Sequence, residues 1–202
     1  MHIKHCFHIF FWGGFMKNYQ ITEWCSHFIS QQVQPGDLCI DATMGNGNDT
    51  LLLSKLCGAS GHVLAFDIQE QALCRTKERL QNAGSPVNYT LLLESHSNMY
   101  RYADEESISC IVFNLGYLPG GDHAKATRSE TSIQALEQSL LLLKKGGLLS
   151  LCIYSGGDSG FKERDDVLDW LAQLDSRKYL VIKSEYYNRP NNPPIPVLVI
   201  RL

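Results

Sequence analysis

The sequence predicts an α/β fold built on one Rossmann-like sheet of seven strands, mostly parallel, with helices on both faces and a C-terminal antiparallel hairpin. Short apolar runs alternate with helical segments along the chain, a pattern typical of parallel strands joined by crossover helices. The last two runs, 178–187 and 196–201, are joined by a Pro- and Asn-rich turn, which indicates antiparallel pairing. A chain of 202 residues with 44% hydrophobic content is long enough for one domain with a sizeable core.

An amphipathic segment opens the first half of the chain, with Trp24, Phe28 and Ile29 on or near one face. Pro35-Gly36 closes this segment, so a helix is predicted over 22–33. The alternation that follows predicts, in chain order, strand 38–42, helix 48–57, strand 62–67, helix 69–82, strand 87–93, a short helix 96–102 and strand 108–114.

The second half continues the alternation. A helix over 129–144 is expected to end before Gly146-Gly147, because glycines disfavour continuation of a helix. Strand 148–154, helix 162–174 and the terminal strand pair complete the prediction. Seven strands with a terminal hairpin match the sheet of class I methyltransferases.

Charge and cysteine content narrow the function classes. The net charge is −3, so the protein is not coated with basic patches, and any contact with nucleic acid must come from a local cluster. The seven Cys form no C-x-x-C pair and no zinc spacing. They favour free thiols in a reduced, cytoplasmic compartment.

The N-terminal segment 1–15 breaks the pattern of the domain. It is apolar and aromatic, yet it is too short to span a bilayer and has no small-x-small cleavage site. His2, His5 and His8 bring no carboxylate or further metal ligand with them. The segment is expected to be an upstream extension or a disordered arm, with the folded domain over 16–202 and no association with a membrane.

A Gly-x-Gly turn, Gly45-Asn46-Gly47, is the most informative motif. It follows an apolar run that ends at Asp41, and a helical run begins after it at Asn48. Such a turn leaves backbone N–H groups free at the carboxyl end of a strand, where open α/β sheets bind nucleotide-like ligands. Asp67 ends the next strand, and a carboxylate there can accept both hydroxyls of a ribose. These residues predict a site for an adenosine-containing cofactor.

The residues around this turn bear on which cofactor binds. A dinucleotide fingerprint, G-x-G-x-x-G, would place a third Gly where Thr50 stands. Asp41 and Asp49 put two carboxylates beside the turn, and these repel a pyrophosphate in a partly desolvated cleft. S-adenosylmethionine carries a sulfonium and an ammonium group, which favour anionic neighbours. The pattern therefore favours S-adenosylmethionine over a dinucleotide, and a purely structural Gly turn is the remaining alternative.

The segment 114–117, Asn-Leu-Gly-Tyr, follows the fourth predicted strand, beside the expected position of a transferable methyl group. Amino-group methyltransferases often carry an [N/D]-P-P-[Y/F] turn there, and Asn114 and Tyr117 supply the same polar and aromatic ends. The Asn114 oxygen would accept hydrogen bonds from the target amine, and Tyr117 would pack on the substrate ring. Asp122 would hold the ammonium form instead, so it is not assigned as a base. A Gly- and Pro-rich loop that only caps the sheet is the alternative.

Four stretches of the sequence resemble the MnmM-type (YtqB-like) methyltransferases, a family also labelled rRNA methylases. The stretches are Asp41–Leu51, Ala65–Gln69, Ser95-His96 and Phe113–Asp122, the last of which reads FNLGYLPGGD. The resemblance runs from about residue 17 to the end of the chain. It implies methyl transfer from S-adenosylmethionine to the 5-aminomethyl group of 5-aminomethyl-2-thiouridine at the tRNA wobble position, in the anticodon region, without a metal. It also implies that the cofactor site is lined by Asn46, Asn48, Asp67, Gln69, Ser95 and His96.

One stretch departs from the family's pattern. The family usually has Tyr-Pro-Gly-His-Pro-Gly-Gly after the fifth strand, whereas residues 154–160 read YSGGDSG. The loss of the His and of both prolines leaves a shifted specificity or a reduced activity open. Two alternatives therefore stay beside the main hypothesis: a methyltransferase that acts on rRNA or on a small molecule, and a non-catalytic nucleotide-binding module. A homodimer is also left open.

Overall fold

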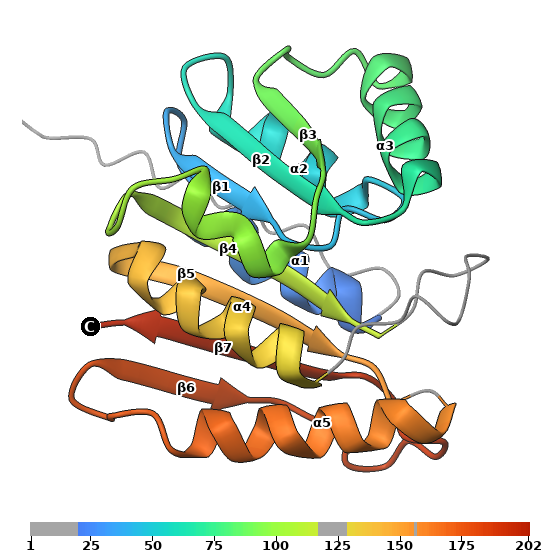
Figure 1. The fold of residues 1–202 in the computed structure, drawn as a ribbon, viewed down its shortest axis with the longest axis vertical. Coiled ribbons are helices and arrows are strands. Elements are labelled where there is room, and N and C mark those ends of the chain that lie inside the picture. The colour runs from blue at the N-terminus through green and yellow to red at the C-terminus, as the bar shows by residue number, and fades with distance from the viewer. Residues whose placement is uncertain (1–19, 117–128, 156) are drawn as a thin grey trace, which may run out of the picture.

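The computed structural model describes residues 20–116, 129–155 and 157–202, which form a seven-stranded sheet flanked by helices (Figure 1). The strands are β1 (Leu38–Asp41), β2 (His62–Asp67), β3 (Tyr89–Leu93), β4 (Ile108–Leu115), β5 (Leu143–Ile153), β6 (Tyr179–Lys183) and β7 (Ile195–Arg201). The helices are α1 (Ile21–Gln32), α2 (Asn48–Cys57), α3 (Glu70–Asn82), α4 (Ser129–Leu142) and α5 (Gly157–Ala172), with a 3-10 helix, η1 (His96–Arg101).

The strand order is β3-β2-β1-β4-β5-β7-β6. The pairs among β1 to β5 are parallel, whereas β7 is antiparallel to both β5 and β6. The predicted fold class, with a mostly parallel sheet and a C-terminal antiparallel hairpin, is confirmed. Because the order turns back between β1 and β4, the carboxyl ends of these two strands form the switch point at which such sheets bind ligands.

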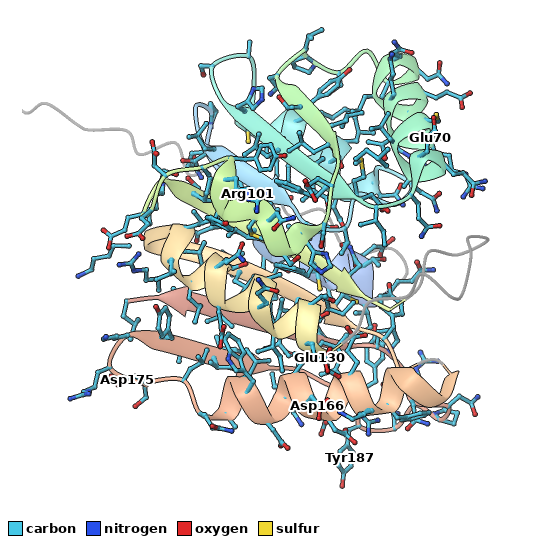
Figure 2. The ribbon with its side chains drawn as sticks, viewed as in Figure 1. Glu70, Arg101, Glu130, Asp166, Asp175 and Tyr187 are labelled. Atoms are coloured by element: carbon cyan, nitrogen blue, oxygen red, sulfur yellow. The ribbon has the colours of Figure 1, made fainter. Side chains whose placement is uncertain are left out.

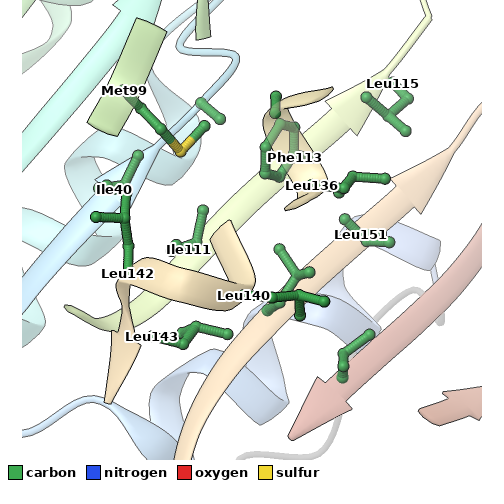
Figure 3. Close-up of a cluster of buried hydrophobic side chains, with 14 of the residues drawn as sticks. Ile40, Met99, Ile111, Phe113, Leu115, Leu136, Leu140, Leu142, Leu143 and Leu151 are labelled. Atoms are coloured by element: carbon green, nitrogen blue, oxygen red, sulfur yellow. The ribbon is translucent and has the colours of Figure 1, made fainter. Parts of the chain in front are cut away.

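Two hydrophobic cores lie on opposite faces of the sheet, because successive side chains of a strand point to opposite faces. Val112 of β4 packs with Ile29 of α1 and Leu53 of α2 on one face. Its neighbour Phe113 belongs to the cluster on the other face, which includes residues of η1, α4 and α5 and is drawn in Figure 3. Strand β4 is buried along nearly its whole length, which explains its almost continuous apolar sequence.

The start of β5 differs from the prediction. The strand begins at Leu143, opposite Ile108 of β4, and not at residue 148, and α4 correspondingly ends at Leu142. The predicted helix stop, Gly146-Gly147, instead lies within an irregularity of the β4–β5 ladder, after which the register shifts. A pair of glycines therefore marks a bulge inside a strand here, and the sequence pattern does not distinguish this from a helix end.

Two further boundaries were predicted wrongly. Helix α5 begins at Gly157 and not at 162, although its Gly-rich start has a low helix propensity. Strand β6 ends at Lys183 and not at 187. Ser184 still donates its N–H to Pro196 O at 2.9 Å, but the prolines that precede β7 have no N–H with which to extend the ladder.

Several expectations from the sequence concern membranes, metals and thiols. In the three described ranges, no helix is long and apolar enough to cross a membrane. Among the same residues, no group of three or more His, Cys, Asp or Glu is arranged to hold a metal ion. The six described cysteines are all free thiols. The expected arm, 1–15, lies outside the described residues.

Candidate functional site

The parallel strands end on one side of the sheet (Figure 1), and polar residues predicted for the site lie at these carboxyl ends. Asp41 and Asp67 end β1 and β2, and Asn114 lies near the end of β4, next to β1 in the sheet. Asp41 stands opposite Ala65 of β2 and Val112 of β4, so the three strand ends lie side by side. Asp49 reaches the same edge from the first turn of α2.

The Gly turn is pressed against helix α3, and this contact explains why Gly47 is needed. Gly47 has a φ of +75°, and a Cβ there would lie 2.9 Å from the Cα and both branches of Thr76. Thr76 also donates its hydroxyl to Gly45 O at 3.3 Å. The turn is thus fixed against α3 by a close backbone approach and by a hydrogen bond.

Asn46 is held by the same helix. Arg75 Nη1 donates to Asn46 Oδ1 at 3.1 Å, and Arg79 Nε donates to Asn46 O at 2.6 Å. The side-chain oxygen of Asn46 therefore faces α3. The turn was expected to leave its backbone N–H groups free, but that of Gly45 donates to Asp67 Oδ2 at 3.0 Å and that of Gly47 donates to Met44 O at 2.7 Å. The resemblance placed Asn46 and Asn48 in the cofactor site; Asn48 is an exposed residue at the start of α2.

Asp67 ties together the turns that follow β1 and β2. Its Oδ2 accepts the N–H of Gly45 at 3.0 Å, and its Oδ1 accepts the N–H of Gln69 at 2.9 Å. Burial raises the pKa of Asp67 and outweighs these two hydrogen bonds, which lower it. Each carboxylate oxygen keeps a second lone pair, so Asp67 can still accept hydroxyl donors from a ligand.

Asp41 is the innermost carboxyl of the site, with no exposed surface. Its Oδ2 accepts the hydroxyl of Thr50 at 2.6 Å, and its Oδ1 accepts the N–H of Thr43 at 3.2 Å. Burial, and then the nearby charge of Asp49, raise the pKa of Asp41 to about 7. Asp41 therefore stabilises the turn through hydrogen bonds and affects the charge of the site from a buried position. It does not offer a surface to a ligand.

Asp49 and Asn114 form a direct pair across the site. Asn114 Nδ2 donates to Asp49 Oδ2 at 2.7 Å, and the backbone N–H of Asn114 donates to Thr43 Oγ1 at 2.7 Å. Because the carboxylate takes the amide N–H, Asn114 Oδ1 is left as an acceptor. Burial raises the pKa of Asp49, although the hydrogen bond from Asn114 lowers it.

The three carboxyls give this edge an unbalanced negative character. No ion pair within the described part of the chain neutralises Asp41, Asp49 or Asp67, and the charges of Asp49 and Asp67 both raise the pKa of Asp41. A cationic ligand at this edge would relieve the repulsion. A pyrophosphate would increase it.

His96 contributes an acceptor that has no partner. Its Nδ1 lies 3.1 Å from Ala42 O, and burial lowers the pKa of the ring, so His96 is neutral with the proton on Nδ1. Nε2 is then a buried acceptor without a hydrogen bond in the described structure, beside the ring of Phe113. An unpaired buried acceptor is costly, and a ligand donor would satisfy it. Ser95 caps η1 by accepting the N–H of Ser97 at 3.2 Å.

Tyr154 begins the stretch that departs from the family's pattern, and the structure places it against the segment that follows Asn114. Its N–H donates to Leu115 O at 3.0 Å, and a Cβ on Gly116 would lie 3.0 Å from Tyr154 Cβ. Burial raises the pKa of Tyr154. The sequence signal that could have identified Tyr154 is an aromatic residue directly after a buried strand. That strand lies next to the strand that carries Asn114. Tyr117 and Asp122, predicted on the other side of Gly116, lie outside the described residues.

Comparison with known proteins places the chain among methyltransferases. The family model described as "Putative rRNA methylase" matches residues 63–200. A tRNA (mnm(5)s(2)U34)-methyltransferase, chloroplastic, of Arabidopsis thaliana is 38% identical over 178 residues, or 83% of this chain. The chain spans 65% of the length of that relative.

Two solved structures are similar along nearly their whole length. A "putative rRNA-methylase" from Clostridium thermocellum is 40% identical, with a TM-score of 0.88 over 91% of this chain and 98% of that one. A "putative methyltransferase" from Streptococcus mutans, solved in complex with SAH, is 38% identical, with a TM-score of 0.81 over 90% of this chain and 97% of that one.

Proposed function

The chain belongs to the rRNA methylase family, and from this membership we propose that it is an S-adenosylmethionine-dependent tRNA methyltransferase. Its substrate would be the 5-aminomethyl group of 5-aminomethyl-2-thiouridine at the wobble position, in the anticodon region. The name of the Arabidopsis relative supports this choice of substrate. The observation that carries the proposal is the Asp49–Asn114 pair, which presents a neutral acceptor, Asn114 Oδ1, beside a carboxylate-rich Gly turn.

The residues of the Gly turn fit the proposed cofactor. S-adenosylmethionine supplies an activated methyl group when it is bound, and it carries a sulfonium and an ammonium but no phosphate. Asp67 would accept its ribose hydroxyls, and His96 Nε2 would accept one of its N–H or O–H donors. Gln69 and Ser95, which adjoin these two residues, complete the proposed cofactor site. The negative character of the edge favours the cation, and the neighbour solved with SAH supports the same class of ligand.

The acceptor side of the site suits a neutral amine. A primary amine is protonated in water and must lose its proton before it attacks a methyl group. Asn114 Oδ1 can accept an N–H of the neutral amine, and an uncharged acceptor does not stabilise the ammonium form as a free carboxylate would. Asp49 fixes the orientation of the amide, so the oxygen is in place before the substrate arrives. Methyl transfer is an in-line displacement, and such positioning supplies much of its acceleration.

The compartment is proposed from the state of the cysteines. The free thiols of the described cysteines support a reduced compartment, and we propose the cytoplasm. The homodimer that the sequence leaves open stays a prediction, which size-exclusion chromatography with light scattering would test.

The proposed function can be tested with the whole chain and natural RNA. The protein is incubated with labelled S-adenosylmethionine and bulk RNA from a strain that lacks this gene, and nucleosides are then separated by mass spectrometry. We expect label in 5-methylaminomethyl-2-thiouridine of the tRNA fraction. Label in rRNA or in small molecules would show that the protein methylates another substrate. No label in any fraction would indicate a binding module without methyltransferase activity.

A further inference from the structure

The connection between β6 and β7, residues 184–194, lies at the same edge of the sheet as the proposed methyl-acceptor site. Ile195 begins β7 opposite Ile153, which ends β5, and Asn114 stands opposite Cys152 in the neighbouring ladder. The antiparallel hairpin therefore turns at the carboxyl edge of the parallel strands, and Figure 1 shows this connection on the side toward which β4 and β5 point.

Tyr186 anchors this connection to the site. It packs against the cluster of Ile21, Cys25 and Cys152, as does Tyr154. Tyr154 in turn contacts Gly116, so a continuous set of contacts joins the connection to the segment that follows Asn114. The connection is also rigid in composition, because it contains three prolines, which fix their own φ angles.

The next residue, Tyr187, has the opposite environment. Its side chain is 99% exposed, and Figure 2 shows it projecting away from the body of the molecule below α5. Other exposed Tyr side chains of the described chain, Tyr100 and Tyr102, are 53% and 41% exposed. An anchored aromatic ring with both faces free presents stacking area at little cost in conformational entropy.

The connection itself carries one positive charge that forms no ion pair among the described residues, and its other exposed residues are mostly polar. Arg189 is exposed and forms no ion pair among the described residues, whereas Glu185 is 3.4 Å from Lys183 and is neutralised by it. Asn188, Asn191 and Asn192 are exposed as well. Protein-binding patches have an apolar core around their aromatic anchors, and such a core is not present here. A free aromatic ring beside an arginine is instead the combination that binds single-stranded nucleic acid.

We propose that residues 184–194 form a contact surface for single-stranded RNA, in which an unpaired base stacks on Tyr187 and Arg189 contacts the backbone phosphate. The proposal rests on the proposed function, since it assumes that the substrate is RNA. It assigns the nucleotides that flank the modified base, and not the modified base itself, to this surface. It also resolves how a protein with a net charge of −3 can hold RNA, because the contact is local.

The test uses the full chain and a fluorescently labelled RNA hairpin with the sequence of an anticodon arm. We expect Tyr187→Ala to weaken hairpin binding by about 5- to 100-fold, the range for loss of one stacked base, and Tyr187→Phe to bind nearly as the wild type does. Arg189→Ala should lower the slope of log Kd against log salt by about one. Cofactor affinity and melting temperature should stay at the wild-type values in all three variants, because both side chains are exposed.

Two substitutions at the opposite edge of the sheet are controls for position. Val87 is 92% exposed just before β3, and Arg177, which is ion-paired with Asp175, lies just before β6. Val87→Ala and Arg177→Ala should leave hairpin binding unchanged. The surface proposal is overturned if Tyr187→Ala binds the hairpin as Val87→Ala does while the wild type methylates RNA, or if light scattering shows that the Tyr187 variant has lost only self-association. A wild-type protein that neither binds nor methylates RNA would overturn the proposed function as well.

Discussion

Asn114 and Asp49, which are 65 positions apart in the chain, are joined by a hydrogen bond of 2.7 Å from the amide Nδ2 to the carboxylate Oδ2. This bond connects the helix that follows the Gly turn to the strand that ends at the proposed acceptor site. The bond fixes the orientation of the Asn114 amide relative to the helix that carries Asp49. Cofactor and acceptor amine would be positioned by one connected group of residues, with Thr43 as its third member.

Asp67→Ala should weaken binding of S-adenosylmethionine by about 1–3 kcal/mol, the usual cost of leaving hydrogen-bond partners unpaired. The loss would come from the ribose hydroxyls and from the freed N–H groups of Gly45 and Gln69, which Asp67 now accepts. Titration calorimetry measures this loss of cofactor affinity. Glu70→Ala is the matched control, because Glu70 is an exposed carboxylate near Asp67, at the start of α3 (Figure 2). Equal affinity in the two folded variants would remove Asp67 from the cofactor site.

Asp41 should make the protein less stable as the pH rises. Its pKa in the folded state is about 7, above the ordinary value of 3.8, so the folded protein keeps a proton that the unfolded chain releases. The free energy of unfolding therefore falls between about pH 4 and pH 7, by about 4 kcal/mol from this group alone. Asp41→Asn cannot ionise and should lack this slope. Urea denaturation of the wild type and of Asp41→Asn at pH 5 and pH 8 measures this difference. If the free energy of unfolding changed equally with pH in both proteins, the raised pKa of Asp41 would be refuted.

Gly47→Ala should destabilise the protein more than Gly84→Ala, although both glycines have a positive φ, +75° and +58°. An Ala in the left-handed region costs about 1–2 kcal/mol. At Gly47 the new Cβ would also meet Thr76 at 2.9 Å, whereas nothing lies within 4 Å at Gly84. We expect an additional loss of about 1–3 kcal/mol at Gly47, together with weaker cofactor binding. Equal losses of stability would show that the turn can move away from α3.

The sequence predicts the fold well where local signals and tertiary packing agree. Helix 48–57 and strand 62–67 have the predicted bounds, because a Gly turn starts one and a terminal carboxylate closes the other. The prediction fails where glycines stand inside an element, at the bulge in β5 and in the first turn of α5. At Gly147 a Cβ would lie 2.8 Å from Lys144 O, so close backbone packing decides the structure there.

The sequence could place the candidate site at the strand ends, but it could not give the geometry of the site. The sequence places Asp41, Asp67 and Asn114 at strand ends, and the structure brings these ends together. The sequence does not indicate that Asn46 faces α3 or that Tyr154 lies against Gly116. These contacts depend on how the turn, helix and strand pack together. No residue spacing in the sequence indicates them.

The proposed positioning role of Asn114 predicts a specific combination of effects. Asn114→Ala removes the amine acceptor and unpairs Asp49, so turnover should fall by about a hundredfold or more. Cofactor affinity should stay near the wild-type value, because neither Asp67 nor His96 is changed. Asn88→Ala is the control for a structural Asn, since Asn88 bonds the backbone of Ser54 and Gly58 far from the site. It should lower the melting temperature without lowering the turnover of the folded protein.

The most direct measurement is therefore the single-turnover rate of methyl transfer to unmodified tRNA by wild type and Asn114→Ala, with saturating cofactor and RNA. Cofactor affinity and melting temperature are measured on the same samples. We expect Asn114→Ala to be folded, with a rate about a hundredfold lower than that of the wild type and an unchanged cofactor affinity. A rate equal to that of the wild type would contradict it, and the methyl-acceptor site would then have to be sought around Tyr154.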